Sequence, residues 1–208
     1  MDTSMTVGEL IPRWQGRILS ASRYAGIRTV KAPTDFWMYQ ELVFATRPQV
    51  IIEIGNYYGG MLLAMAHWLD VIGMGRVKGV DLSHANIPNP VWEHPRIDLF
   101  TGDACAVFPQ VAESIDPGCT RVLVLEDSSH TFDNTLAVLN TYSVLVQPGG
   151  YFIVEDTICH HGLDHGPQPG PFEAVQVFLG EHPNWATDRS MEAFELTWNS
   201  GGYLKRNG

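Results

Sequence analysis

The chain has 208 residues, of which 45% are hydrophobic and 17% are charged, a composition typical of a globular protein rather than of a disordered one. Its 23 acidic residues exceed its 13 basic residues, so the formal charge is −10. This acidity argues against nucleic-acid phosphate as the main partner. The length suits one domain with a sizeable core. We expect a single domain over 31–208, preceded by a short N-terminal segment, 1–30.

The cysteines and the first residues of the sequence bear on the cellular compartment in which the protein is expected. The three cysteines are odd in number and have no C-x-x-C spacing, which favours a reducing compartment (Cys105, Cys119 and Cys159). The start, MDTSMTVGEL, has neither the basic nor the apolar region of a signal peptide. No apolar run approaches the roughly 20 residues of a membrane helix. We therefore expect a cytoplasmic protein with no membrane partner.

The first predicted elements are helices. A helix is expected at 9–19, with Pro12 near its first turn. Another is expected after Lys31, capped by Thr34 or Asp35 and ended at Arg47-Pro48. Because a helix this rich in aromatic residues suits core packing, we interpret its aromatic residues as packing against a sheet rather than as a ligand platform.

The stretch at 50–60, VIIEIGNYYGG, predicts a buried strand, a glycine turn and the start of a helix over 61–69. This order is typical of the first unit of an α/β domain that holds a nucleotide-like ligand. The spacing differs from the dinucleotide pattern G-x-G-x-x-G, because an acid, Glu53, lies inside the strand. That carboxylate would repel a pyrophosphate and favour a cationic, amino-bearing ligand such as S-adenosylmethionine (SAM). The alternative is an ordinary strand-to-helix turn.

The rest of the chain alternates strands and helices. Strands are expected at 76–81, 96–100, 121–127 and 151–156, with closing strands around 185–188 and 194–204. Residues 84–95 contain three prolines and are expected to form a loop, whereas helices are expected to run to about Val146 and over 172–180. This alternation predicts a doubly wound α/β sheet, with ligands bound outside the carboxyl ends of the strands.

Two acids follow the second and third strands. Asp81 ends the second strand, where nucleotide folds hold ribose hydroxyls. Asp103 follows the third strand, and two interpretations of it stay open. It either accepts from an adenine amino group or caps the helix that starts near Ala104.

Three further acids and one histidine lie at the next two strand ends. Asp127 ends the fourth strand, and Glu155 and Asp156 end the fifth. Unpaired carboxylates would raise one another's pKa, a cost that a bound Mg²⁺ removes. His130 lies three residues after Asp127, so a helical start would place both on one side and make His130 a general base. The alternative is that Asp127 caps the helix and the other acids lie on the surface.

The segment 157–170, TICHHGLDHGPQPG, holds three histidines beside Cys159. His160, His161 and His165 with that cysteine suggest zinc, but their spacing matches no standard zinc site. Since glycine and proline surround them, we interpret this segment as a lid on the acceptor side.

Several motifs together resemble the cephalosporin hydroxylase family, which is similar to SAM- and Mg²⁺-dependent O-methyltransferases of macrolide and rhamnose sugars. The motifs are K-x-P-x-D-x-W-x-Y-Q-E (31–41), I-E-I-G-x-x-x-G-G (52–60), D-S-x-H (127–130), V-E-D-T (154–157), G-P-x-x-A-V-x-x-F-L (170–179) and T-W-N-S-G-G-Y-L (197–204). The resemblance covers roughly 31–206. It implies a Rossmann-like class I SAM-dependent methyltransferase fold with a mostly parallel seven-stranded sheet.

The resemblance also implies roles. It implies metal ligands at Asp127, Glu155 and Asp156, and a base at His130. The predicted SAM-binding residues are Glu53, Gly55, Asn56, Tyr57, Gly59, Asp81, Leu82, Asp103 and Ala104. The expected reaction is methyl transfer to a hydroxyl of a small molecule with vicinal oxygens, either a sugar or another secondary-metabolite scaffold. Homo-oligomerisation stays open.

Three other functions are compatible with parts of this sequence. The first is a SAM-binding protein that does not methylate and acts as a cyclase or as a partner subunit. The second is a metal-dependent hydrolase and the third a nucleotide-binding module. Glu53 and the missing phosphate loop argue against the hydrolase.

Overall fold

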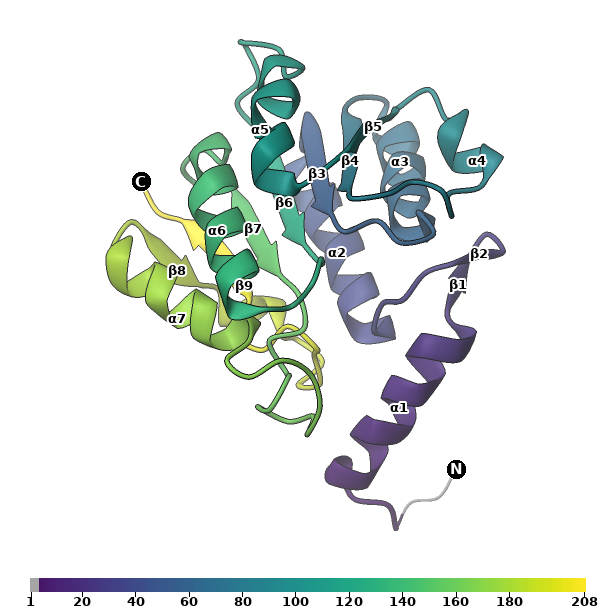
Figure 1. Cartoon of the computed structure of the whole chain (residues 1–208), viewed down its shortest axis with the longest axis vertical. Coiled ribbons are helices and arrows are strands. Elements are labelled where there is room, and N and C mark those ends of the chain that lie inside the picture. Colours follow the sequence, from purple (N-terminus) through teal and green to yellow (C-terminus); the bar gives the residue numbers. More distant parts are fainter. Residues whose placement is uncertain (1–3) are drawn as a thin grey trace.

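The computed structural model describes residues 4–208 and contains a central sheet with helices on both faces (Figure 1). In the described residues the sheet has seven strands, in the order β5-β4-β3-β6-β7-β9-β8. The strands are β3 (Val50–Ile54), β4 (Arg76–Asp81), β5 (Ile97–Thr101), β6 (Val122–Glu126), β7 (Tyr151–Val154), β8 (Trp185–Thr187) and β9 (Tyr203–Arg206). The first five pair in parallel, and β9 is antiparallel to β7 and β8. The predicted mostly parallel, doubly wound sheet is confirmed.

Alternating side chains along each strand build two separate core layers. Ile51 on β3 packs in the layer of α2 (Pro33–Thr46) and α3 (Gly60–Ile72). Ile52 packs in the opposite layer with α5 (Ala104–Glu113), α6 (Phe132–Tyr142) and α7 (Pro171–Glu181). Because successive side chains of a strand point to opposite faces, burying both faces needs continuous apolar runs, as the sequence has.

The chain reverses its winding direction at β3, whose neighbours β4 and β6 come from different halves of the fold. Ligands of open α/β sheets bind at such a switch point, outside the carboxyl ends of the strands. The functional site is therefore expected between the loops that follow β3, β4 and β6.

The N-terminal segment stands at one side of this edge (Figure 1). It consists of α1 (Val7–Ala21) and a short hairpin of β1 (Arg23–Tyr24) and β2 (Ile27–Arg28). Thr6 and Glu9 form a capping box at the start of α1. A third apolar cluster joins Ile11 and Ile18 of α1 to Leu163 and Trp198. Residues from three distant parts of the chain therefore hold α1 against the domain.

Four local expectations are wrong. Residues 84–95 contain a short helix, α4 (Asn89–Trp92), whose first turn accommodates a proline. The last strand is Tyr203–Arg206 rather than 194–204, because turns and the 3₁₀ helix η2 (Arg189–Met191) occupy much of the stretch after β8. The helix expected to reach Val146 stops at Tyr142 and continues as the 3₁₀ helix η1 (Ser143–Leu145).

The fourth wrong expectation concerns the cap of α2. Its N-cap is Ala32, followed by Pro33 at the first helical position. Asp35 instead is buried and accepts a hydrogen bond from the backbone N–H of Trp198 at 2.7 Å.

In the part of the chain that the structure describes, no helix is long and apolar enough to cross a bilayer.

Candidate functional site

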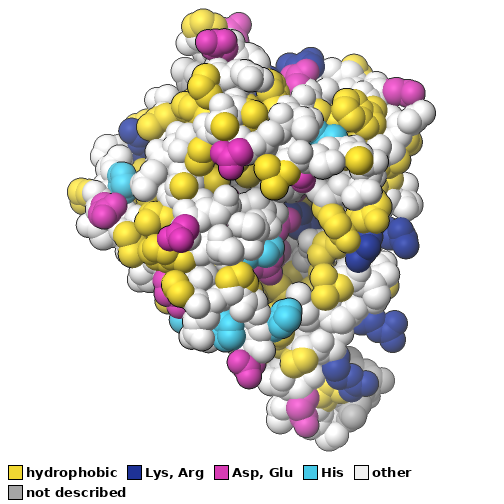
Figure 2. All heavy atoms as spheres, in the orientation of Figure 1, with side chains coloured by type: hydrophobic (Ala, Val, Ile, Leu, Met, Phe, Trp, Pro, Cys, Tyr) yellow, Lys and Arg dark blue, Asp and Glu magenta, His cyan; other side chains and the backbone are white. Residues whose placement is uncertain are grey.

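A cavity of about 640 Å³ opens at the carboxyl ends of β3, β4, β6 and β7. Figure 2 shows it as a hollow in which acidic and histidine side chains gather beside hydrophobic ones. Its walls come from the loops after these strands, from α1, from the segment 157–170 and from Trp198. The volume lies within the range of small-molecule sites.

The glycine turn after β3 presses closely against the end of β6. Gly55 has φ +89°, and a Cβ there would lie 2.0 Å from the backbone oxygen of Asp127. Glycine is therefore required both by the backbone conformation and by the missing space. This contact places the first turn and the first acid of the predicted metal set on the same wall.

Asp81 fixes the same turn from the neighbouring strand. Its Oδ2 accepts hydrogen bonds from the backbone N–H groups of Asn56 at 2.7 Å and Tyr57 at 3.2 Å. Its Oδ1 accepts from the N–H of Ser83 at 3.1 Å. Because a carboxylate has about four lone-pair sites, Asp81 keeps acceptor capacity for a ligand hydroxyl.

Six of the nine predicted SAM-binding residues line the cavity: Gly55, Tyr57, Asp81, Leu82, Asp103 and Ala104. Glu53, Asn56 and Gly59 are not among the lining residues. Asn56 is buried behind the wall, where its amide nitrogen donates to the Glu53 carbonyl at 2.9 Å. Asp103 does cap α5, since its side chain accepts from the N–H of Ala106 at 3.0 Å, and it also faces the cavity. The two interpretations of Asp103 are therefore compatible.

The acidic centre consists of two groups that share Asp127. In the first, ligand atoms of Asp127, His130 and Asp156 all lie within 4.8 Å of one another. In the second, the same holds for Glu53, Asp127 and Glu155. Carboxylate oxygens are the ligands that Mg²⁺ prefers, so this donor set fits that ion. The predicted trio of Asp127, Glu155 and Asp156 is thus divided between two groups.

Strand alternation explains this division. Ile51, Leu125 and Ile153 lie in the layer of α2 and α3. Glu53, Asp127 and Glu155 follow them by two residues, so they share that face. Asp156 is one residue further along, and its φ of +56° turns its carboxylate toward His130 instead. Counting alternate residues from the buried strands would have indicated this division.

Lys31 lies in the middle of the second group and was missed as a site residue. Its Nζ is 2.7 Å from Glu155 Oε1 and 3.3 Å from Glu53 Oε1, and it also contacts Asp127 Oδ2. Its side chain is 4% exposed. Burial lowers the pKa of Lys31, but the three carboxylates outweigh burial and raise the pKa well above its ordinary value. Lys31 is therefore charged.

The carboxylates around Lys31 outnumber the nearby positive charge. Burial raises the pKa of Glu53 to about 7, against the opposing effect of Lys31. Burial and the charge of Asp127 raise the pKa of Glu155. Burial also raises the pKa of Asp156 to about 6, opposed by His130. Three carboxylates share the single ammonium of Lys31, so the group carries an excess of negative charge that a divalent cation would offset.

His130 faces Asp127, but not for the expected reason. Residues 127–131 are not helical, α6 begins at Phe132, and His130 has φ +56°. Its Nε2 lies 3.4 Å from Asp156 Oδ2 and 3.8 Å from Asp127 Oδ1. Burial lowers the pKa of His130, but the charges of Asp156 and Asp127 outweigh it and raise the pKa. Nδ1 is buried and has no hydrogen-bond partner.

A second missed residue, the acid Glu126, holds the loop that carries His130. Glu126 is fully buried on the face of α6 and accepts hydrogen bonds from Ser128 and from Thr135 Oγ1, the latter at 3.2 Å. Asn134 Nδ2 donates to Ser128 Oγ at 2.7 Å. This network orders residues 127–131, and its signal in the sequence is the first acid in LED, which alternation places on the opposite face from Asp127.

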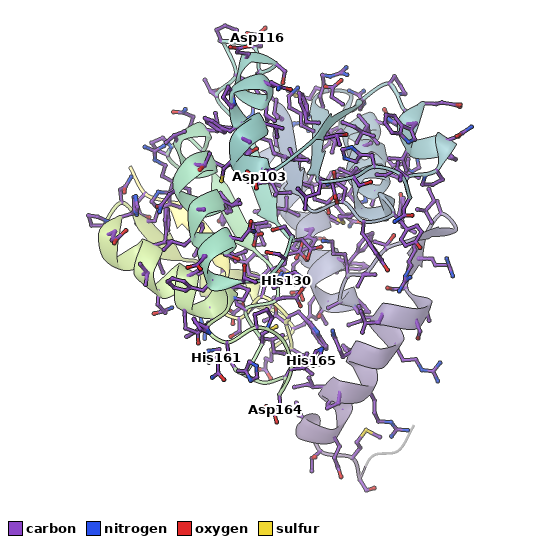
Figure 3. The ribbon with its side chains drawn as sticks, viewed as in Figure 1. Asp103, Asp116, His130, His161, Asp164 and His165 are labelled. Atoms are coloured by element: carbon purple, nitrogen blue, oxygen red, sulfur yellow. The ribbon has the colours of Figure 1, made fainter. Side chains whose placement is uncertain are left out.

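The histidine-rich segment forms no zinc site within residues 4–208, where the two groups above are the only ones with metal-ligand spacing. His161 Nε2 lies 2.8 Å from Glu173 and His160 Nε2 lies 2.9 Å from the Gly166 carbonyl. His165 lines the cavity, and Figure 3 shows it on the side of the segment nearer to α1, with Asp164 at the outer tip. This position on the cavity wall is compatible with the predicted lid.

Comparison with known protein sequences gives matches that all carry the description rhamnosyl O-methyltransferase. The sequence model described as Rhamnosyl O-methyltransferase/CmcI matches residues 17–207. A rhamnosyl O-methyltransferase of Mycobacterium tuberculosis is 30% identical over 98% of this chain and 86% of its own length. The rhamnosyl O-methyltransferase of Mycobacterium leprae is 29% identical over 91% of this chain and 85% of its own.

Solved structures show the same fold. CmcI with Mg and SAM superposes with a TM-score of 0.73 at 23% identity, covering 91% of this chain and 78% of that one. The O-methyltransferase TomG from Streptomyces achromogenes, in complex with SAM, gives a TM-score of 0.61 at 16% identity over 86% of this chain and 82% of that one. The fold is therefore that of class I SAM-dependent methyltransferases, as the sequence predicts.

Proposed function

Because the chain belongs to the rhamnosyl O-methyltransferase/CmcI family, we propose that it transfers the methyl group of SAM to a hydroxyl of a sugar or other secondary-metabolite scaffold with vicinal oxygens. The observation that carries this proposal is the geometry of Asp127, His130 and Asp156. They lie together on the wall of the cavity that also contains the glycine turn of β3. Methyl donor and acceptor hydroxyl would thus meet in one cavity.

We propose that the SAM side of the cavity is formed by the turn after β3 and by the ends of β4 and β5. Gly55 and Tyr57 give it a close backbone approach, and Asp81 offers acceptors for the ribose hydroxyls. Leu82 is 74% exposed beside Asp81, an apolar surface suited to the adenine ring. Glu53, Asn56 and Gly59 support this wall from behind.

Asp127, Glu155 and Asp156 are the proposed ligands of Mg²⁺. Their fit rests on the donor chemistry and on the excess of carboxylates over the one nearby ammonium. Glu155 Oε1 is already taken by Lys31, so its second oxygen would serve the ion. When bound, a divalent cation supplies Lewis acidity that lowers the pKa of a nearby acceptor hydroxyl.

His130 is the proposed general base. Its Nε2 points toward Asp127 and Asp156, two of the residues that would hold the metal, so it would lie beside an acceptor hydroxyl bound there. The two carboxylates stabilise the imidazolium that forms when Nε2 takes the hydroxyl proton. Most of the rate enhancement would come from this positioning and from the buried charges.

The acceptor is proposed to bind on the side of the cavity that α1 and the segment 157–170 line. Ile18 and Leu19 on α1, and Leu163 with Trp198 opposite them, line this side of the cavity. His165 lies on the same wall and supports the proposed lid role. Such a wall offers apolar contact area around a small number of polar groups, as small-molecule sites generally do.

A methyltransferase assay with metal removal tests the proposal. Purified protein would be incubated with SAM and a panel of rhamnosides and other vicinal diols, and products followed by mass spectrometry. We expect a methylated product with Mg²⁺, no product in EDTA, and a SAM affinity by calorimetry that changes little in EDTA, because the SAM side holds no predicted metal ligand. Full activity in EDTA would overturn the metal role. SAM binding without methylation of any acceptor would favour the non-methylating alternative.

A further inference from the structure

The position of Lys31 resembles that of a bound cation. Its Nζ lies among oxygens of Glu53, Asp127 and Glu155, a group that has the spacing of metal ligands. Buried carboxylates need a positive partner, and breaking such a group by removing the cation leaves costly unpaired charges. Within residues 4–208 no other lysine or arginine forms an ion pair with these three acids.

The backbone keeps Lys31 in this position. Its residue lies just before α2, and its backbone N–H donates to the Thr29 carbonyl at 3.0 Å. Four residues later, Asp35 on the first turn of α2 is bonded to Thr197 and Trp198. The start of α2 is thus fixed to the C-terminal segment, and Lys31 reaches the acids from outside the sheet.

The two oxygens of Asp127 have different partners. Oδ2 contacts Lys31, whereas Oδ1 faces His130 Nε2 at 3.8 Å. A hydrogen bond to one oxygen of a ligating carboxylate orients the other oxygen toward the metal. Lys31 therefore engages Oδ2 of Asp127 and leaves Oδ1 free to face His130 and Asp156.

We propose that Lys31 is a positioning residue: its ammonium replaces a cation among Glu53, Asp127 and Glu155, so that the acidic centre is assembled before Mg²⁺ binds and the ion is directed to the Asp156 side of Asp127. This inference rests on the metal role proposed above. It goes further by proposing that Lys31 supplies part of the positive charge that the acids require. The same ammonium lowers the affinity for Mg²⁺, because it repels the ion.

The test substitutes Lys31→Met, which keeps the length of the side chain and removes its charge. Lys78→Met is a matched control, because Lys78 is 2% exposed and pairs with Asp98, and neither residue lines the cavity. Metal-free wild type and both variants would be compared by calorimetric titration with MgCl₂. Thermal unfolding would be measured in EDTA and in saturating Mg²⁺.

We expect Lys31→Met to bind Mg²⁺ at least tenfold more tightly, about 1.4 kcal/mol, because a positive charge beside the ion is gone. Its melting temperature should fall in EDTA and recover in Mg²⁺. Its turnover at saturating Mg²⁺ should remain below wild type, because Asp127 has lost its orienting partner. Lys78→Met should lower the melting temperature equally with and without Mg²⁺.

Unchanged or weaker Mg²⁺ binding by Lys31→Met would overturn the proposal, as would a loss of stability that Mg²⁺ does not restore. Should Lys31→Met fail to fold in EDTA, Lys31→Met/Glu53→Gln compared with Glu53→Gln gives the same charge test with one acid fewer. Wild type that binds no Mg²⁺ would contradict the proposed metal role instead. If the double variant is more stable in EDTA than Lys31→Met, that result would still support charge replacement by Lys31.

Discussion

The side-chain oxygen of Asn199 accepts a hydrogen bond from the backbone N–H of Asp156 at 3.2 Å, which ties the C-terminal segment to the end of β7. The amide nitrogen of Asn199 donates to the Tyr39 hydroxyl at 2.5 Å, and Asn199 is 1% exposed. Asp156 has φ +56°, a conformation that non-glycine residues adopt at a cost. Asn199 therefore supports the backbone that aims a proposed metal ligand.

Asn199→Ala is expected to weaken Mg²⁺ binding by about 10–100-fold, the usual effect of losing a partner that orients a ligand. Because it also leaves buried polar groups unpaired, the free energy of unfolding should fall by about 1–3 kcal/mol. Calorimetric titration and urea unfolding measure the two effects. Asn140→Ala, on an exposed position of α6, is the control and should change neither. Normal Mg²⁺ binding by Asn199→Ala would remove this role of Asn199.

Gly55→Ala should be strongly destabilising, by more than about 3 kcal/mol, because the new Cβ would collide with backbone at the end of β6. Gly73→Ala is the matched control: Gly73 has a similar φ of +81°, but a Cβ there would meet nothing within 4 Å. That variant should lose only about 1–2 kcal/mol, the cost of the left-handed conformation. Thermal unfolding of both variants separates crowding from backbone strain. Equal losses would mean that the turn can move away from β6.

His130→Asn should reduce turnover by about 10²–10⁴-fold, the usual contribution of a general base. Asparagine tolerates the positive φ of this position, so the loop should keep its conformation. Binding of SAM and Mg²⁺, measured by calorimetry, should be retained. Raising the pH should partly restore turnover, because the acceptor hydroxyl then ionises without a base. A variant with wild-type turnover would exclude His130 as the base and leave the metal role intact.

The Asp98 carboxylate should make stability depend on pH in the acidic range. Arg76 donates to it from Nε at 2.9 Å and from Nη2 at 2.5 Å, and these hydrogen bonds lower the pKa of Asp98. A carboxyl whose pKa is lower in the folded state stabilises the fold above its unfolded pKa, and loses that effect as the pH falls through the folded value.

The difference in unfolding free energy between wild type and Asp98→Asn should therefore be constant above about pH 5 and shrink toward pH 3. Urea unfolding at a series of pH values measures it. A difference that stays the same down to pH 3 would show that the Arg76 pair contributes nothing through the charge of Asp98.

The sheet, and the edge of it at which the site lies, follow from local patterns in the amino-acid sequence. Continuous apolar runs such as 122–125 can be buried on both faces only in a parallel sheet covered by helices, and the acids that end these runs then share one edge. Gly55 and Asp81 were identified for the same reason, because turn chemistry and strand ends are local properties of the chain.

The partners of these acids depend on how distant parts of the chain pack together. Lys31 is 96 residues from Asp127 and 124 from Glu155, and Asn199 is 43 from Asp156. No local pattern links residues so far apart, because their contact follows from how α2 and the C-terminal segment pack on the sheet. The alternation of side chains along the strands predicts the face on which each acid lies. The cation with which each acid pairs depends on tertiary packing alone.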